Sequence, residues 1–198
     1  MKKSIEFYTC LIEERLSRER FAHSVNTAEM CRELAFVNGY EPEKAELAGI
    51  LHDICKEDDE SDLKELAFSK FLEKAGIGLD PLEKEDKLWH APAGAVYLRE
   101  TLEVNDMEIL SAVRFHSVGR AKMTKLEKIL YLGDLVERGR DYPDVEKYRE
   151  LALTDLDLGM YEAFKWAIND CLKKKYRVCR NTYEGYNYYL KKIMQRKA

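Results

Sequence analysis

The stretch AGILHDICK (residues 48–56) places a histidine and an aspartate side by side in an apolar run that is otherwise typical of a buried helix. Burying an imidazole and a carboxylate without partners costs several kcal/mol, about the penalty for an unpaired buried charge. Lys56 follows His52 by one helical turn. The position of the His52–Asp53 pair therefore indicates that other residues of the chain or a bound ligand compensate its buried charge.

The composition is that of one globular domain. The chain has 198 residues, of which 45% are hydrophobic and 35% charged, and no apolar stretch approaches the roughly 20 residues that cross a bilayer. The first residues read as an amphipathic helix, because Glu6, Glu13 and Glu14 interrupt its apolar positions, which a signal peptide would not allow. Five cysteines without a CxxC pair are typical of reduced thiols. We expect a cytoplasmic protein that does not bind membranes.

The charge pattern gives little support to nucleic-acid binding. The net charge is −4, although residues 151–198 hold 10 Lys and Arg against 5 Asp and Glu. Such a local excess could contact phosphates, but a basic run is more often a solvated helix end, and we favour that interpretation. The run consists of Lys173, Lys174, Lys175, Arg177 and Arg180.

Helical spacing of apolar residues runs through almost the whole chain, and no segment predicts a strand. Cap signals mark several helix ends: Ser17 before one helix and Gly39 after it, Asp106, and the capping box of Thr124 with Glu127. Residues 1–198 are therefore predicted to form a single all-α domain, with motifs over about 18–140 and further helices over about 144–198. The expected helices cover 4–16, 18–38, a segment from Pro42 through the HD pair, 62–75, one or two helices over 81–102 broken near Pro92, segments following Asp106 and Thr124, 155–177 and 183–197.

Four histidines and two unusual carboxylates stand on separate expected helices. Taken singly, each histidine is more often an ordinary core or surface residue than a ligand, and His-Asp is a common dipeptide. The joint pattern is much stronger, because imidazole and carboxylate groups are the ligands that Fe, Mn and Zn accept. The residues are His23, His52 with Asp53, His90, His116 and Asp134.

This H…HD…H…H…D order resembles the HD-domain metal-dependent phosphohydrolase superfamily. The segments RFAHSVNTAEMCRELA, AELAGILHDICK, HAPAGAVYL, ILSAVRFHSVGRAKMTKLEKILYLGDLVERGRDYP and NTYEGYNYYL are similar to its YqeK branch, over roughly residues 18–190. The resemblance implies a single-domain helical HD fold with a metal site between core helices. It also implies a symmetrical bis(5′-nucleosyl)-tetraphosphatase that uses iron to cut diadenosine tetraphosphate into two ADP.

The resemblance also implies roles for individual residues. Asp53 is expected to orient or deprotonate the attacking water, and His90 and His116 to bind phosphate or protonate the departing ADP. One ion is favoured over two, although His90 and His116 would complete a second site, and Mn, Co or Zn would fit as well as iron. The expected metal ligands are His23, His52, Asp53 and Asp134, and the expected substrate contacts are Arg20, His23, Lys56, His90, His116, Ser117 and Arg140.

Two departures from the family pattern and two rival functions remain. The chain has HSVG where the family usually has HTTG, so Val118 lacks a second hydroxyl, and it has GD where AD is usual, with Gly133 beside Asp134. The same centre would also serve another HD nucleotide phosphohydrolase, such as a nucleoside mono- or triphosphatase or a phosphodiesterase. A non-catalytic, metal-bound nucleotide sensor is the alternative from another class. The nucleotide substrate is the expected partner, and no residues are assigned to the pocket for its base. Formation of a homodimer remains one alternative for the oligomeric state.

Overall fold

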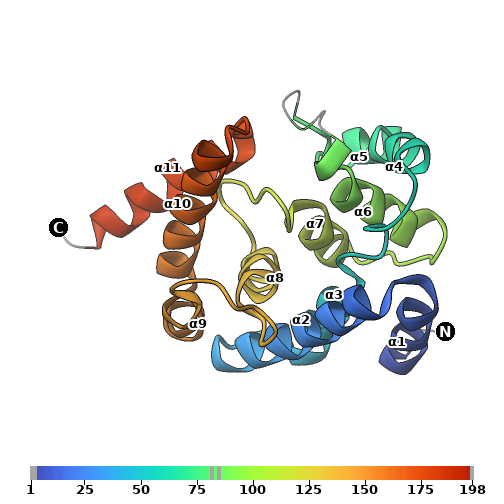
Figure 1. Cartoon of the computed structure of the whole chain (residues 1–198), viewed down its shortest axis with the longest axis horizontal. Coiled ribbons are helices and arrows are strands. Elements are labelled where there is room, and N and C mark those ends of the chain that lie inside the picture. The colour runs from blue at the N-terminus through green and yellow to red at the C-terminus, as the bar shows by residue number, and fades with distance from the viewer. Residues whose placement is uncertain (1–3, 81–82, 84–85, 197–198) are drawn as a thin grey trace.

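The computed structural model describes residues 4–80, 83 and 86–196, and every regular element within those ranges is a helix. This confirms the predicted all-α class. The elements, labelled in Figure 1, are α1 (Ile5–Arg15), α2 (Arg18–Val37), α3 (Pro42–Leu51), α4 (Glu60–Ala67), α5 (Lys70–Lys74), the short 3-10 helix η2 (Asp86–Leu88), α6 (His90–Glu100), α7 (Met107–Phe115), α8 (Lys125–Val136), α9 (Val145–Thr154), α10 (Leu156–Lys174) and α11 (Arg180–Gln195).

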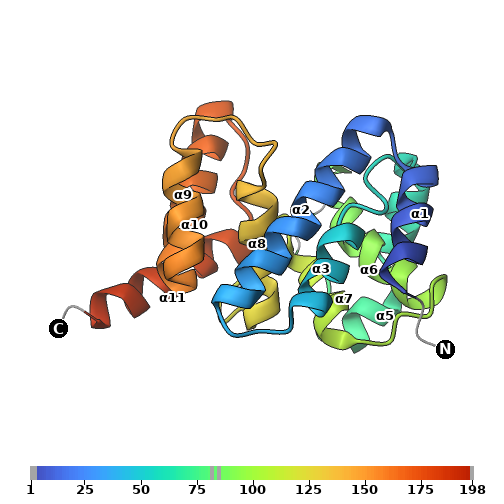
Figure 2. The ribbon, with the colours of Figure 1, turned by 90° about the horizontal axis from the view of Figure 1, so that it is seen from below.

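Helices α2 and α8 run through the middle of the molecule. Helices α1 and α3 to α7 lie on one side of them and α9 to α11 on the other, with the two chain ends far apart (Figures 1 and 2). Helix α2 packs against α3 and α8, while α8 also packs against α7, α9 and α10. The helices that carry the expected site residues are therefore direct neighbours.

The crossing of α2 and α3 depends on small residues. A Cβ added at Gly49 on α3 would lie 2.6 Å from the Cα of Ala28 on α2, so a larger residue would force the two backbones apart. Because the two helices run antiparallel through this contact, the end of α3 comes to lie beside the first turns of α2. The contact thus brings His52 next to His23.

Most of the predicted helix ends are confirmed. The hydroxyl of Ser17 accepts a hydrogen bond from the Arg20 amide, and Asp106 caps α7 through the amides of Glu108 and Ile109. At the start of α8, Thr124 and Glu127 form both hydrogen bonds of the capping box. These bonds satisfy amides that have no partner within the helix, which explains why the sequence signals are reliable here.

Four details differ from the expectations. Helix α3 ends at Leu51, so the HD pair lies in the following turn and not within the helix. The helix expected over 62–75 is two helices, because the chain breaks after α4 and Ser69 caps α5. Pro92 does not interrupt α6, since it occupies the first turn, where the missing amide hydrogen costs no bond. Helix α9 falls within the helical region expected over about 144–198, but no separate helix was assigned to its residues, and residues 81, 82, 84 and 85 lie outside the described residues.

The described part of the chain contains no helix that combines the length and apolar character required to cross a membrane. Its apolar side chains instead meet in one continuous core that includes Ile12, Leu34, Leu51, Leu130 and Phe164.

Candidate metal centre

The four histidines come from helix ends that meet beside α8. His23 lies in the second turn of α2, His52 follows the last residue of α3, His90 is the first residue of α6, and His116 follows the last residue of α7. Their ring centroids form a chain of contacts, with 5.1 Å between His23 and His52, 5.0 Å between His52 and His116, and 5.2 Å between His116 and His90. All four predicted histidines are therefore brought together.

Each imidazole is held through its Nδ1 atom. The Nδ1 of His52 lies 2.7 Å from the carbonyl oxygen of Gly49, that of His116 lies 2.7 Å from the Val113 carbonyl, and that of His90 lies 3.1 Å from the Lys87 carbonyl. A carbonyl oxygen only accepts, so each Nδ1 carries the hydrogen and donates it. The Nε2 atoms of these three rings are left with a lone pair, which is the form that binds a metal ion.

The Nε2 atoms converge on one small volume. His52 Nε2 lies 3.3 Å from His23 Nε2, and His90 Nε2 lies 3.3 Å from His116 Nε2. Asp134 Oδ1, on α8, lies 3.0 Å from His23 Nε2 and 3.9 Å from His52 Nε2. Lone pairs that face one another at such distances require a proton or a cation between them. The arrangement can therefore hold a cation.

Asp53 stands between the two pairs of histidines. Its Oδ2 lies 3.5 Å from His52 Nε2 and 3.9 Å from His23 Nε2, whereas its Oδ1 lies 3.4 Å from His116 Nε2 and 3.6 Å from His90 Nε2. The side chain is 4% exposed, and Oδ1 is a buried oxygen without a hydrogen-bond partner. A cation would compensate a buried carboxylate oxygen in that state.

The chemistry of these donor atoms fits a transition-metal ion. His23, His52 and Asp53 offer three ligand atoms within 4.8 Å of one another, as do His52, His116 and Asp134, and also Asp53, His90 and His116. Two neutral imidazoles with two carboxylates suit Fe, Mn, Co or Zn, and do not choose among them. The structure thus brings the four expected metal ligands, together with His90 and His116, into one cluster.

The charges of the cluster are strongly coupled. Burial raises the pKa of Asp53, but the neighbouring His52 and His116 outweigh that effect and hold it well below its usual value. Burial also opposes protonation of His23, yet its hydrogen bonds to Asp134 and Glu137 raise its pKa to about 9. Burial, followed by the charges of His116 and Lys56, lowers the pKa of His90 to about 3. The carboxylates around His23 thus favour positive charge at its ring.

Glu137 is a site residue that the sequence analysis did not assign. It directly follows α8, its side chain is 4% exposed, and its Oε1 accepts a hydrogen bond from His23 Nδ1 at 3.2 Å. Its Oε2 accepts the amide hydrogen of Gly139. The carboxylate therefore orients the His23 ring and keeps Nε2 directed at Asp134. Its position one turn after Asp134 was the only signal in the sequence.

The expected cationic residues also lie at the cluster. Arg20 donates to Asp53 Oδ2 at 2.9 Å, and Arg140 donates to Asp134 Oδ1 at 2.7 Å and to the Asp134 carbonyl at 3.0 Å. The Lys56 ammonium lies 3.1 Å from His90 Nε2, and burial lowers the pKa of Lys56 despite the charge of Asp53. Both arginines thus contact the expected metal ligands directly, which spacing alone did not indicate.

The two departures from the family pattern have structural explanations. Val118 is 3% exposed and packs in the core, so a hydroxyl there would be buried, and only its carbonyl is used, as the acceptor from Thr182. Ser117 lines the cleft described below, and its hydroxyl oxygen is buried without a hydrogen-bond partner. At Gly133, an added Cβ would lie 2.5 Å from the sulfur of Cys31 on α2. The glycine beside Asp134 therefore makes room for that cysteine.

A cleft of about 390 Å³ opens over the cluster. Its polar end is lined by Arg20, Lys56, Asp53, His90, His116 and Asp134. This volume lies within the range of about 300–1,000 Å³ that is usual for small-molecule sites. Its other end is apolar and aromatic. The cleft therefore joins the candidate metal centre to a surface of different chemistry.

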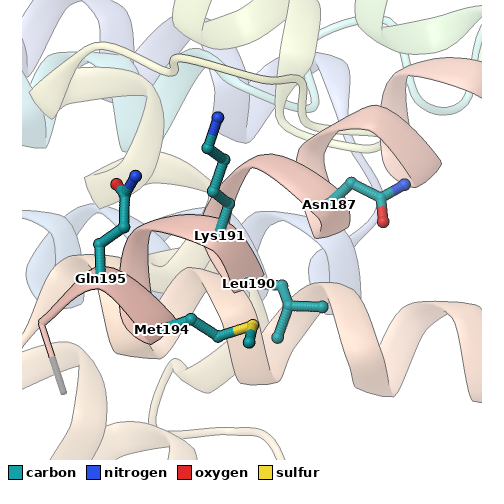
Figure 3. A pocket seen from close by; sticks show the side chains of 5 residues that line it. All are labelled: Asn187, Leu190, Lys191, Met194 and Gln195. Atoms are coloured by element: carbon teal, nitrogen blue, oxygen red, sulfur yellow. The ribbon is translucent and has the colours of Figure 1, made fainter. Parts of the chain in front are cut away.

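Figure 3 shows a second hollow, of about 320 Å³, whose five lining residues all come from the last turns of α11. They are Asn187, Leu190, Lys191, Met194 and Gln195. None of these side chains is a histidine or a carboxylate, so the chemistry of the cluster has no counterpart there.

Comparison with known proteins gives the family. Residues 20–139 match the family model described as the HD domain, which spans every residue of the cluster from Arg20 to Glu137. The chain belongs to the HD-domain family. A solved structure from Clostridium acetobutylicum, described as a predicted HD superfamily hydrolase involved in NAD metabolism, covers 97% of this chain and is itself fully covered. It superposes with a TM-score of 0.87 at 27% sequence identity, which confirms the HD fold.

Three relatives of this HD-domain chain carry the name bis(5′-nucleosyl)-tetraphosphatase, symmetrical. The relative from Halalkalibacterium halodurans is 37% identical over 89% of this chain and 92% of its own length. The one from Staphylococcus aureus is 33% identical over 94% of both chains, and the one from Bacillus subtilis is 33% identical over 89% and 92%. The resemblance expected from the motifs is therefore confirmed over nearly the whole chain.

Proposed function

We propose that this protein is a metal-dependent hydrolase that cleaves diadenosine tetraphosphate symmetrically, so that one water and one substrate give two ADP. The observation that carries the proposal is the convergence of four imidazole Nε2 atoms and two carboxylates at the cationic end of one cleft. The names of the three relatives supply the substrate class. A polyanionic substrate matches the polar end of the cleft, where Arg20, Lys56 and Arg140 lie.

The proposed metal ligands are His23, His52, Asp53 and Asp134, around one ion that we take to be iron. When bound, such an ion lowers the pKa of a coordinated water and polarises a phosphoryl oxygen. The donor set supports the proposal because its carboxylates stay ionised, and because the Nδ1 atoms of His52 and His23 are already held by Gly49 and Glu137. The ring orientation therefore does not have to be created when the ion arrives.

The chain's own residues have separate roles in the proposal. Asp53 orients the attacking water and accepts its proton through Oδ1, the buried oxygen that has no other partner. Lys56 supplies a point charge to a phosphoryl oxygen, and Arg140 offers a bidentate contact. Arg20 and the Ser117 hydroxyl complete the phosphate contacts. Phosphoanhydride hydrolysis depends mainly on this kind of positioning and charge compensation.

His90 and His116 are proposed to contact phosphate. Since the Nδ1 atoms of both rings donate to backbone carbonyls, only a protonated Nε2 can donate to a phosphoryl oxygen. The negative charge of the substrate favours that protonated form, and at His90 it has to outweigh the burial and the neighbouring charges that lower the pKa to about 3. The same two Nε2 atoms with Asp53 Oδ1 are the ligand set that a second ion would use. Counting the ions per chain distinguishes the two roles.

The proposal is tested by incubating metal-analysed protein with diadenosine tetraphosphate and separating the products by ion-exchange chromatography. We expect two ADP per substrate, and loss of the reaction in Asp53→Ala and on chelation. Cys10→Ala is a matched control, because Cys10 is exposed on α1 and outside the cluster. Products ATP and AMP would place cleavage at a different phosphate, while nucleotide binding without turnover would indicate a sensor. The cytoplasmic location and the homodimer stay predictions.

A further inference from the structure

The apolar end of the cleft is formed by aromatic side chains from two segments. Tyr142 lies between α8 and α9, and Trp166 lies in the third turn of α10. Their ring centroids are 5.4 Å apart, with an angle of 35° between the ring planes. Leu135 and Ala167 line the cleft beside them. These four residues, which we call the aromatic wall, line the cavity with apolar and aromatic side chains.

The aromatic wall is held in place from behind. The Tyr142 hydroxyl donates a hydrogen bond to the Leu135 carbonyl at 3.0 Å, and the centroid of the Tyr148 ring lies 6.2 Å from that of the Tyr142 ring. Leu135 and Tyr148 pack against the main core, whereas Tyr142 and Trp166 are not among the described side chains that do so. Trp166 is half-buried. Ordinary core packing therefore does not account for the position of these two rings.

The wall and the cationic groups divide the cleft into two ends. Arg140 binds Asp134, and Tyr142 follows it by two residues, so the chain leads directly from the cationic groups to the aromatic wall. At the outer edge, the carboxylate of Asp170 lines the cleft but is paired with Lys174 at 2.8 Å. The charge of Asp170 is therefore compensated, and it does not repel a phosphorylated ligand. One end suits phosphate and the other suits a planar ring.

We propose that the aromatic wall binds the nucleobase of the half-substrate whose phosphates lie at the metal centre, with the base stacked on Trp166. This inference rests on the proposed function, and it adds a binding site for the base. Four tyrosines near the C-terminus, Tyr176, Tyr183, Tyr186 and Tyr189, are not among the described residues that line the cleft. Tyr189 and Tyr186 instead stack on Phe164 and Tyr161.

Stacking on a tryptophan has a direct optical signature. The chain contains two tryptophans, Trp89 and Trp166, and Trp89 is 6% exposed with its ring packed on Phe68. Titration of the metal-loaded wild-type protein with ADP is expected to quench its fluorescence, whereas inorganic pyrophosphate, which has no base, is not. In Trp166→Phe only the Trp89 emission remains, and the difference between ADP and pyrophosphate should disappear.

Affinity supplies a second readout. We expect Trp166→Leu to weaken ADP binding roughly 10- to 100-fold, the range for loss of one base–aromatic stack, with pyrophosphate affinity changed less than about twofold. Trp166→Phe keeps a ring and should retain most of the ADP affinity. Tyr161→Leu is the matched control, because it removes another aromatic ring from α10 that does not line the cleft.

The outcomes separate this inference from the proposed function. Fluorescence that responds equally to ADP and pyrophosphate, or a Trp166→Leu variant that loses both ligands equally, would overturn the base site while leaving hydrolysis intact. Base-dependent quenching without formation of two ADP would support the base site and contradict the proposed reaction. Failure to bind either ADP or diadenosine tetraphosphate would contradict both. The wild-type titration requires no variant, so poor folding of Trp166→Leu does not prevent the test.

Discussion

Replacement of Gly133 by alanine probes the tight contact beside Asp134. The new Cβ would lie 2.5 Å from the sulfur of Cys31, about an ångström closer than ordinary van der Waals contact. Cys31 is fully buried, so its side chain has no open space into which it can rotate. We therefore expect Gly133→Ala to strain the interface between α2 and α8.

The magnitude follows from two opposing effects. Overpacking a dense core costs about 1–3 kcal/mol, whereas glycine to alanine within a helix gains about 1 kcal/mol. The single variant should thus lose up to about 2 kcal/mol of unfolding free energy. With Cys31→Ala, the nearest remaining atoms are the Cys31 backbone N and Cα at 3.6 and 3.7 Å, which is ordinary contact. Gly133→Ala should then be neutral or stabilising, giving a coupling energy of about 1–3 kcal/mol.

The assay is urea unfolding of the wild type, both single variants and the double variant. All four proteins are measured with chelator present, so that differences in metal binding do not add to stability. Hydrolysis by the metal-loaded proteins gives a second readout, because strain at residue 133 displaces the neighbouring Asp134. We expect activity to fall in Gly133→Ala and to recover in the double variant. A coupling energy below about 0.5 kcal/mol would refute the reasoning.

Three further predictions concern separate contacts. Glu137→Gln should weaken metal affinity about 10- to 100-fold, measured by competition with a chelator, because His23 loses a charged acceptor; unchanged affinity would contradict this role. Arg140→Met should raise KM, because a phosphate contact is lost. It should not lower the metal content, since the Arg140 guanidinium competes with an ion for Asp134, and a loss of bound metal would contradict this role. Asp157 pairs with Lys128, Lys192 and Arg196, and although burial opposes the effect, the two lysines lower its pKa. The stability that the Asp157 carboxylate contributes is therefore present at neutral pH, and it is lost as the pH falls below about 4 through the lowered folded-state pKa. Asp157→Asn should thus lower the unfolding free energy by about 2 kcal/mol at pH 7 and by progressively less in unfolding experiments at acid pH.

Local signals predicted most helix boundaries. Ser17, Asp106 and Thr124 cap helices because a short polar side chain satisfies amides only two or three residues away, which sequence spacing reveals. The same kind of reasoning failed for residues 62–75, where a serine inside the apolar pattern starts a new helix. It also assigned no separate helix to α9, which begins at Val145 after Asp144 in a left-handed conformation without a side-chain cap.

The sequence by itself determined the helical class and the set of titratable residues, since the spacing of apolar residues and the order of His and Asp are properties of the chain. Tertiary structure alone decided how those residues face one another. Glu137 meets His23 across 114 residues of sequence, Asp53 directs one oxygen to each pair of histidines, and Trp166 reaches the cleft from α10. Contacts between distant segments depend on how the helices pack, and no local pattern carries that information.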